Sequence, residues 1–248
     1  MNRPAALFSC LLVLSFVLYS CFPQKSSEAS DNSNKDIRRK YYSDGTLHKE
    51  MVYKDGKQNG MAKEFFQSGK LFQEVPYQNG LREGIARRYY ESGTLSQETP
   101  YHNDLMHGIQ KKYRRSGDLM CEIPYYKGEL CVGLKEYTTD GKLKKRYPSI
   151  VITPVDDILL NEMYTLRLKM SDGSKGVEYY VGKLSEGGYI GNDARRIWEV
   201  INGEAEVNYP MPRGTFLMEE VNIIAKVKTS QSNYFITEAK FHLAIENR

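Results

Sequence analysis

A segment that recurs every 24 residues constrains this chain more than any other feature. Residues 80–101 read GLREGIARRYYESGTLSQETPY, and the chain reads GKQNGMAKEFFQSGKLFQEVPY 24 residues earlier and DLMHGIQKKYRRSGDLMCEIPY 24 residues later. Columns of glycine, leucine, glutamate and tyrosine keep this spacing, for example Gly45, Gly69, Gly93, Gly117 and Gly141. Internal repeats of this kind indicate an array in which each unit packs against its neighbours.

Within each unit, the pattern is that of β-strands joined by tight turns. Apolar and polar residues alternate, and pairs such as Asp55-Gly56, Asn79-Gly80 and Ser92-Gly93 separate the alternating runs. Asp-Gly and Asn-Gly between β-favouring runs are the strongest short signal for a hairpin. We therefore predict an all-β chain in which the repeats form one antiparallel sheet, with each two-stranded repeat advancing the sheet by roughly 10 Å.

The repeat resembles the MORN repeat, in the variant found in bacterial antitoxins of the YwqK type. The residues that carry the resemblance are the paired aromatics, the Ser-Gly or Asp-Gly that follows them and the next glycine downstream, as in NGLREGIARRYYESG. The resemblance covers residues 41–147 and implies a sheet of MORN-type hairpin repeats. It also implies lipid binding or protein scaffolding, whereas the antitoxin variant implies a cytosolic partner.

The 24-residue pattern stops after Leu143, and a different β pattern occupies residues 148–248. Alternating runs begin at Tyr164, Val221 and Phe235, and glycine-containing turns separate them. About seven strands in roughly 100 residues are typical of a β-sandwich. The profile looks like an immunoglobulin-like domain of the bacterial envelope, but the chain has no Cys…Trp…Cys signature.

Residues 1–20 have the features of a lipoprotein signal peptide. Arg3 precedes the apolar run AALFSCLLVLSFVL, which is shorter than the roughly 20 residues that a membrane span needs. The run ends in Leu-Tyr-Ser-Cys, which resembles a bacterial lipobox and implies that Cys21 becomes the lipidated first residue, carrying acyl chains such as palmitate. An ordinary secretory signal cleaved near Ser20 is the alternative. Either signal exports the chain, and the polar residues 21–40 then read as a flexible tether.

Export leaves Cys121 and Cys131 as the cysteines of the folded chain, in a compartment that permits disulfides. Composition alone therefore leaves a bond between them open. A hairpin turn at Lys127-Gly128 argues against the bond, because it places Cys131 opposite Pro124 and Cys121 three residues further along. At about 3.3 Å per residue, that separation is too large for an undistorted bridge.

A basic column is the main candidate for a binding site within the repeats. It consists of Arg39, Lys63, Arg87, Lys111 and Lys135. Position parity places these residues on the same strand face as aromatics such as Tyr89 and Tyr113. One interpretation is a stripe that binds anionic lipid or cell-wall glycan. The other, which we favour, is structural: the alkyl stems pack beside the rings, and the charges reach water or the glutamates that recur with the same period.

Several function classes are not supported by the sequence. The chain has 35 basic and 31 acidic residues, and a formal charge of +4 gives no electrostatic reason to expect nucleic-acid binding. The four histidines lack metal-ligand spacing, and no nucleophile motif or phosphate loop is present. We therefore expect no enzyme activity, no metal and no cofactor.

Trp198, next to Arg195 and Arg196, belongs to a cluster in the second part of the chain that resembles an interaction hot spot. A single tryptophan in a β-sandwich is more often part of the core, and this is the interpretation that we favour. Residues 195–200 are compatible with a strand or with a short helix. Specific recognition is expected where the repetition fails, around residues 121–133, at the sheet ends or in the second part.

These features predict an exported, lipid-anchored protein of the cell envelope that acts as a non-catalytic scaffold or protein-binding module. Its predicted partners are the membrane, through the lipid, and an envelope protein. Phe22 rather than aspartate follows Cys21, which favours the outer membrane over the inner membrane. Direct binding of anionic lipid or cell-wall glycan, and an intracellular role like that of an antitoxin, are the alternatives.

Overall fold

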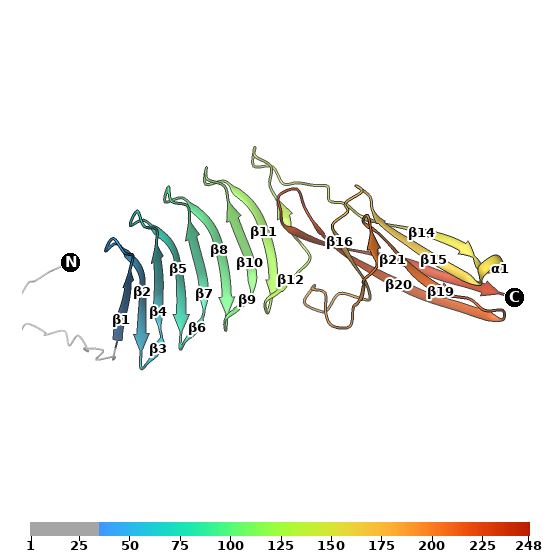
Figure 1. The fold of residues 1–248 in the computed structure, drawn as a ribbon, viewed down its shortest axis with the longest axis horizontal. Helices are drawn as coiled ribbons and strands as arrows, with labels where there is room; N and C mark the ends of the chain where they lie inside the picture. The colour runs from blue at the N-terminus through green and yellow to red at the C-terminus, as the bar shows by residue number, and fades with distance from the viewer. Residues whose placement is uncertain (1–34) are drawn as a thin grey trace, which may run out of the picture. The chain divides into compact units, whose positions relative to one another are not determined.

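The structure is a computed structural model that describes residues 35–248, and these residues fold almost entirely into β-strands (Figure 1). The repeats form one large antiparallel sheet, and the remaining strands form two four-stranded sheets. The predicted all-β fold with a sheet of hairpin repeats is confirmed. The predicted signal peptide, Cys21 and the first part of the predicted tether lie outside the described residues.

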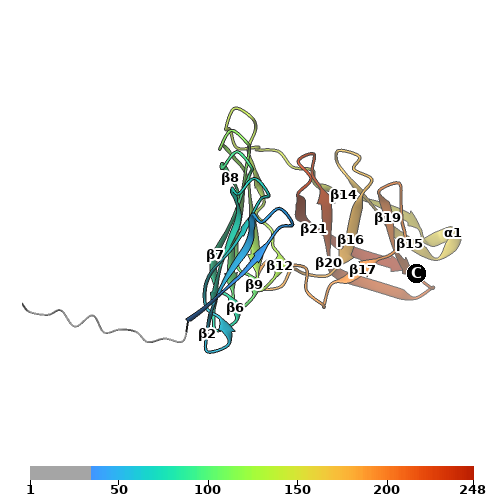
Figure 2. The same ribbon diagram turned by 60° about the vertical axis from the view of Figure 1, so that its left-hand side comes forward.

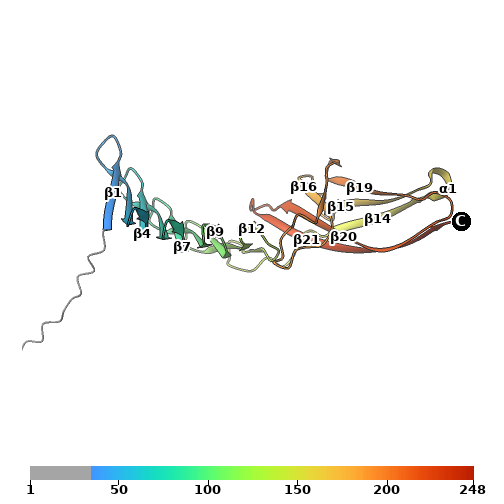
Figure 3. The ribbon, with the colours of Figure 1, turned by 90° about the horizontal axis from the view of Figure 1, so that it is seen from below.

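The repeat sheet is a meander in which each long strand pairs with the next one along the chain. Figure 1 shows these strands in chain order, and Figure 3 shows the hairpins following one another. The strands are β1 (Lys35–Tyr41), β2 (Leu47–Lys54), β3 (Lys57–Gln58), β4 (Gly60–Phe65), β5 (Leu71–Gln78), β6 (Leu81–Arg82), β7 (Gly84–Tyr89), β8 (Leu95–His102), β9 (Leu105–Met106), β10 (Gly108–Tyr113), β11 (Leu119–Tyr126), β12 (Glu129–Leu130) and β13 (Lys135–Glu136).

The predicted turns adopt the conformation that closes a hairpin. Asp55 and Gly56 have φ values of 50° and 77°, and Asn79 and Gly80 have values of 53° and 93°. Two successive positive φ values are typical of a type I′ turn, whose twist matches that of the flanking strands. The next repeat makes the same turn at Asn103-Asp104, because these two residue types tolerate the left-handed region.

The repeat sheet has a single layer, and most of its side chains are half-buried on one face or the other. Its buried apolar side chains gather towards the C-terminal end, where Cys121, Ile123 and Leu134 form a small cluster. Tyr147 and Phe235 pack against this cluster. A sheet with so little core must be stabilised by contacts between neighbouring side chains along its own faces.

The second glycine column is required by backbone conformation and by close packing. Gly84 has a φ of +103°, and a Cβ atom at this position would lie 3.3 Å from Cγ of Pro76. Gly108 repeats the arrangement against Pro100, with a φ of +110° and a distance of 3.2 Å. The recurring glycines and prolines are therefore complementary parts of one packing contact between adjacent strands.

The remaining strands form a β-sandwich of two sheets that share one core (Figure 2). Leu166 and Leu168 from one sheet and Ile223 and Leu243 from the other are buried in the same cluster. The strands pair in the orders β14-β15-β19-β18 and β17-β16-β20-β21. Their bounds are β14 (Ile150–Asp157), β15 (Met163–Met170), β16 (Val177–Val181), β17 (Arg195–Ile197), β18 (Val200–Ile201), β19 (Glu204–Pro210), β20 (Thr215–Lys228) and β21 (Tyr234–Asn247), with the short helix α1 (Ile158–Asn161) after β14.

The alternating runs at Tyr164, Val221 and Phe235 lie in β15, β20 and β21, as predicted. The resemblance to an immunoglobulin-like domain, and the division of the chain into domains at residues 147 and 148, stay predictions. Residues 34–248 form one compact unit in the structure.

Two expectations about local structure are corrected. The tether was predicted to extend to residue 40, but residues 35–40 belong to β1, because Ile37 and Arg39 already follow the 24-residue period. Residues 195–200 form neither one strand nor a helix. They divide into β17 and β18, which belong to different sheets, so the chain passes from one layer of the sandwich to the other at Trp198-Glu199.

Among residues 35–248, no helix is long and apolar enough to cross a membrane.

The glycine column gives a test of the packing. Gly84→Ala should lower the free energy of unfolding by about 2 kcal/mol, because the new methyl group meets Pro76 and alanine disfavours positive φ. Gly93→Ala is the matched control: Gly93 also has a positive φ, +90°, but open space surrounds its Cβ position. Gly93→Ala should lower the free energy of unfolding by about 1 kcal/mol, because only the positive φ disfavours alanine at this position. Equal losses in urea denaturation would show that the contact with Pro76 is unimportant.

Candidate binding surfaces

The basic column and the glutamate column form a single line of alternating charge across the repeat sheet, which we call the charge row. Its members pair in register from one strand to the next. In order across the sheet they are Arg39, Glu50, Lys63, Glu74, Arg87, Glu98, Lys111, Glu122 and Lys135. Opposite charges on directly facing residues of antiparallel strands stabilise the pairing.

Several residues of the basic column, which were candidates for ligand binding, form ion pairs with glutamates of the charge row. Nε of Arg39 lies 2.8 Å from Oε2 of Glu50, and Nε of Arg87 lies 3.2 Å from Oε1 of Glu98. Nζ of Lys135 lies 3.6 Å from Oε2 of Glu122. The arginines and this lysine therefore have carboxylate partners within the sheet, which is the arrangement that the structural interpretation expects.

The aromatic column is tied to the same carboxylates. The hydroxyl groups of Tyr89 and Tyr113 each donate a hydrogen bond of 2.9 Å to the glutamate of the preceding repeat, Glu74 and Glu98 respectively. Burial, followed by the hydrogen bond to Glu98, raises the pKa of Tyr113 to about 12. The structure thus brings Arg87, Tyr89 and Tyr113 together, as predicted, but it brings them together around glutamates.

A second aromatic column joins each repeat to the next through the backbone. The hydroxyl groups of Tyr42 and Tyr90 donate to the carbonyl oxygens of Phe65 and Tyr113, at 2.8 and 2.7 Å. Arg114 occupies the equivalent position in the following repeat, and its Nη2 donates to the carbonyl oxygen of Tyr137 at 2.6 Å. These bonds span neighbouring repeats and so fix their spacing.

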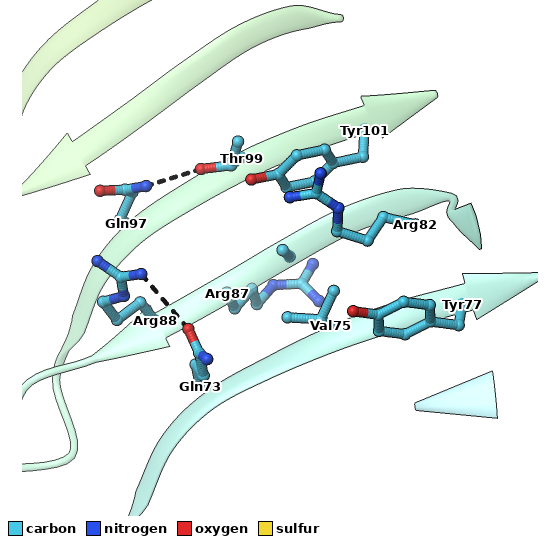
Figure 4. A pocket seen from close by; sticks show the side chains of 10 residues that line it. Gln73, Val75, Tyr77, Arg82, Arg87, Arg88, Gln97, Thr99 and Tyr101 are labelled. Atoms are coloured by element: carbon cyan, nitrogen blue, oxygen red, sulfur yellow. Dashed lines mark hydrogen bonds between the residues drawn. The ribbon is translucent and has the colours of Figure 1, made fainter. Parts of the chain in front are cut away.

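The opposite face of the sheet carries a hollow of about 280 Å³, shown in Figure 4. Successive residues of a strand point to opposite faces, so Arg88 lies on the hollow face while Arg87 belongs to the charge row. The hollow is lined by Gln73, Val75, Tyr77, Arg82, Ala86, Arg87, Arg88, Gln97, Thr99 and Tyr101. No carboxylate is among these residues, so the hollow offers positive charge, amides and phenol rings, whereas the hydroxyl of Thr99 is buried and accepts from Gln97 and Gln110.

The place where the repetition fails is used within the chain itself. The glycine column shifts by one residue from Gly108 to Gly133, and the structure accommodates the extra residue at Val132. The amide of Val132 donates to the carbonyl of Gly188 at 2.9 Å, and Cys131 forms a β-bridge with Tyr189. The irregularity predicted to serve recognition therefore contacts the sandwich of the same molecule.

A buried polar group completes this contact between the repeats and the sandwich. Glu136 is fully buried, and its carboxylate lies 3.1 Å from Nζ of Lys144. It also accepts hydrogen bonds from Thr229 and, at 2.9 Å, from Nδ2 of Asn233. Oδ1 of Asn233 in turn accepts a bond of 3.1 Å from Nζ of Lys112. The turn between β20 and β21 thus satisfies the charge that the last repeat buries. Nothing local in the sequence signals this contact, because Asn233 lies 97 residues from Glu136.

Cys121 and Cys131 are both free and buried in the structure. The amide of Cys131 donates to the carbonyl of Pro124 at 3.0 Å, which is the register that argued against a bond between the two cysteines. The thiol of Cys121 contacts Oδ1 of Asn233 instead. Burial raises the pKa of the Cys121 thiol, so it behaves as a packed side chain.

Trp198 is the clearest correction among the candidate residues. It was expected in the core, but 81% of its surface is exposed. Its position at the crossover between the two sheets explains the exposure, because neither layer covers a residue that connects them. The guanidinium group of Arg196 lies 4.6 Å from the centre of the indole ring and holds one side of it.

The predicted lipidation site Cys21 lies outside the described residues. Among residues 35–248, no cluster of three or more histidine, cysteine, aspartate or glutamate side chains has the geometry to hold a metal ion.

The buried polar group gives a second test. Asn233→Ala should lower the free energy of unfolding by about 2 kcal/mol, because Glu136 and Lys112 would each lose a hydrogen-bond partner next to a buried charge. Asn192→Ala, at an exposed asparagine, is the control and should change it by less than about 0.5 kcal/mol. Similar values for the two variants in urea denaturation would contradict the role assigned to Asn233.

Comparison with known proteins agrees with the repeat architecture. Three consecutive segments, residues 37–55, 58–79 and 82–103, match the family described as MORN repeat variant. No curated protein matches the chain, and no solved structure does. Repeats of this family are commonly modules that bind proteins or lipids and are generally not enzymes. Three segments of the chain therefore match the MORN repeat variant, which is compatible with a non-catalytic binding role.

Proposed function

We propose that this protein is an exported, lipid-anchored protein of the cell envelope that acts as a non-catalytic scaffold and binds a partner protein through its C-terminal sandwich. The lipobox-like residues ending at Cys21 support the anchor and the export. Phe22 after Cys21 favours the outer membrane. The MORN-variant repeats support a binding role rather than an enzymatic one.

The distribution of exposed apolar side chains carries the proposal. In the repeat sheet, the most exposed large apolar side chain is Tyr41, at 59%. Six side chains of the sandwich are more exposed than this: Leu159, Leu160, Trp198, Ile201, Phe216 and Met218. Large exposed apolar groups are typical of surfaces that bind other proteins, and tryptophan is enriched at the energetic centres of such surfaces.

Trp198 and Ile201 are the best candidates for the centre of the contact. They are 81% and 64% exposed, and they flank the crossover between the two sheets. A hollow of about 450 Å³ adjoins Ile201 and is lined by Arg167, Glu206 and Asn208 among others. An apolar anchor beside a polar hollow matches the usual composition of a protein interface, with an apolar centre and a polar rim.

The charge row gives less support to a binding stripe for anionic lipid or glycan. Arg39, Arg87 and Lys135 have carboxylate partners at 2.8 to 3.6 Å. An anionic ligand would have to compete with these glutamates for these three cations, whereas Lys63 and Lys111 form no ion pair within residues 35–248. The antitoxin alternative requires a chain that keeps its N-terminus in the cytosol, which does not fit the predicted signal peptide.

The proposal is tested in two steps. The mature protein should have the mass of a chain that begins at Cys21 and carries acyl groups, and Cys21→Ser should remove the protein from the membrane fraction. A photo-crosslinking amino acid in place of Trp198 should then give a discrete adduct with an envelope protein, and Ile201→Lys in the same chain should abolish it. The same crosslinker at Lys70, an exposed turn residue of the repeat sheet, is the control.

An unmodified mature mass would refute the anchor. Adducts that form equally at Lys70 and Trp198, or that survive Ile201→Lys, would refute the assignment of the partner surface to the sandwich.

A further inference from the structure

We infer that the hollow on the face opposite the charge row is a binding site for an acidic oligosaccharide, with Arg88 as the residue that binds the sugar carboxylate. The site lies in the repeat sheet, on the strands from β5 to β8 (Figure 4). It shares no residue with the sandwich surface, so it is independent of the anchor and of the protein partner proposed above.

The charge balance of the hollow favours an anionic ligand. Arg82 and Arg88 lie on this face, whereas Arg87 belongs to the charge row on the other face. Arg82 has a carboxylate partner, because its Nε lies 3.0 Å from Oδ1 of Asp104. Among residues 35–248, no carboxylate lies within ion-pair distance of Arg88. Its Nη2 instead lies 3.4 Å from Oε1 of Gln73, an amide oxygen. The hollow thus contains an exposed guanidinium group whose charge the protein does not neutralise.

The neighbouring repeats carry different residues at the position of Arg88 and so provide internal controls. The equivalent hollow one repeat earlier is smaller, about 130 Å³, and Glu64 takes the place of Arg88. Glu64 is itself paired with Lys49 at 3.2 Å. One repeat later the position is Lys112, whose ammonium group donates to Asn233 of the sandwich. Among the three equivalent residues Glu64, Arg88 and Lys112, Arg88 is thus the cation that has neither a carboxylate nor a sandwich residue as partner within residues 35–248.

The residues opposite Arg88 also differ in part from their equivalents in the neighbouring repeats. The row of residues on the hollow face places Gln73 and Gln97 directly opposite Arg88 on the two adjacent strands. Gln73 and Gln97 belong to the same 24-residue column, which has Lys49 in the preceding repeat and Cys121 in the following repeat. Thr99 likewise stands where the neighbouring repeats have Val75 and Ile123. The middle hollow therefore combines an exposed guanidinium group with two amides. The hydroxyl of Thr99 is buried and accepts hydrogen bonds from Gln97 and Gln110, and Gln73 also donates to Glu64.

This set of groups fits the chemistry of an acidic sugar. A guanidinium group can bind a carboxylate through two parallel hydrogen bonds. Amide side chains such as that of Gln97 both donate and accept hydrogen bonds, as the hydroxyl groups of a sugar require. The phenol rings of Tyr77 and Tyr101 border the hollow (Figure 4). Tyr77 offers apolar surface to a sugar ring, whereas the guanidinium group of Arg82 lies 4.2 Å from the centre of the Tyr101 ring and covers one side of it.

The shape of the face favours an extended chain over a compact ligand. Shallow hollows follow one another at the spacing of the repeats, which is roughly 10 Å because each repeat contributes two strands about 4.8 Å apart. An oligosaccharide can follow such a row, with its carboxylate at Arg88 and neutral units in the flanking hollows.

The test uses the purified full-length protein in detergent and two kinds of probe. Oligogalacturonate and oligomannuronate carry a carboxylate on each sugar, and the methyl ester of oligogalacturonate is the neutral match. We expect titration calorimetry to show binding of at least one of the two acidic oligosaccharides. If oligogalacturonate binds, the affinity of its methyl ester should be at least about tenfold lower. Arg88→Gln should weaken binding of the acid by at least about tenfold, and Arg88→Lys should weaken it less, because lysine keeps the charge but loses the second hydrogen bond.

Arg115→Gln is the matched control, since Arg115 is also an exposed arginine of the repeat sheet but lies outside the hollow. It should leave the affinity unchanged. Binding of neither acid, equal binding of acid and ester, or equal effects of Arg88→Gln and Arg115→Gln would each overturn the inference. Retention on anionic phospholipid vesicles that depends on Arg88, without binding of either oligosaccharide, would show that the hollow serves a lipid headgroup and would overturn the assignment to a sugar.

Discussion

The repeat sheet depends on the pairing of opposite charges across its strands. It has a single layer, so no continuous core lies beneath it to select one strand register over another. A shift of one residue would move every side chain to the opposite face. The charge row makes such a shift unfavourable, because each glutamate faces a basic residue on both neighbouring strands. The tyrosine hydroxyls that donate to the same glutamates add a second set of contacts with the same period.

This constraint determines where the molecule is free to bind other molecules. Side chains that hold the register cannot also serve a ligand without loss of stability, and the strict repetition of the charge row is what a structural role requires. Residues that depart from the period are under no such demand. They fall into three groups in the structure: the residues that contact the sandwich around Val132 and Glu136, the polar set around Arg88, and the exposed apolar side chains of the sandwich.

The division between these groups explains how much could be predicted from the sequence. The 24-residue period predicts the meander, the type I′ turns at Asp55 and Asn79, and the line of Arg87 with Tyr89, because local spacing alone decides them. It also suggests glutamates as the partners of the basic column. Contacts between distant residues could not be predicted in this way. The shift at Gly133 is visible in the sequence, but its partner Gly188 is far along the chain, and Asn233 is farther still.

Trp198 shows the limit of a composition argument. The apolar character of tryptophan favours the core, and the residue would be buried if residues 195–200 formed one continuous strand. The chain leaves one sheet and enters the other at this residue, so its ring lies outside both layers. Arg88 could not be predicted for a different reason. The 24-residue period marks Arg87 as a member of the basic column, whereas Arg88 is distinguished only by having no carboxylate beside it. The fold, and not the local sequence, decides whether a carboxylate lies there.

The central claim is that the charge row stabilises the sheet, and a double-mutant cycle on Arg87 and Glu98 tests it most directly. The free energy of unfolding would be measured in urea for the wild type, Arg87→Gln, Glu98→Gln and the double variant, at low and high salt. We expect a favourable coupling of about 0.5 to 1 kcal/mol at low salt that decreases at high salt. A coupling indistinguishable from zero at low salt would contradict it, and would leave the basic column free to act as a binding stripe.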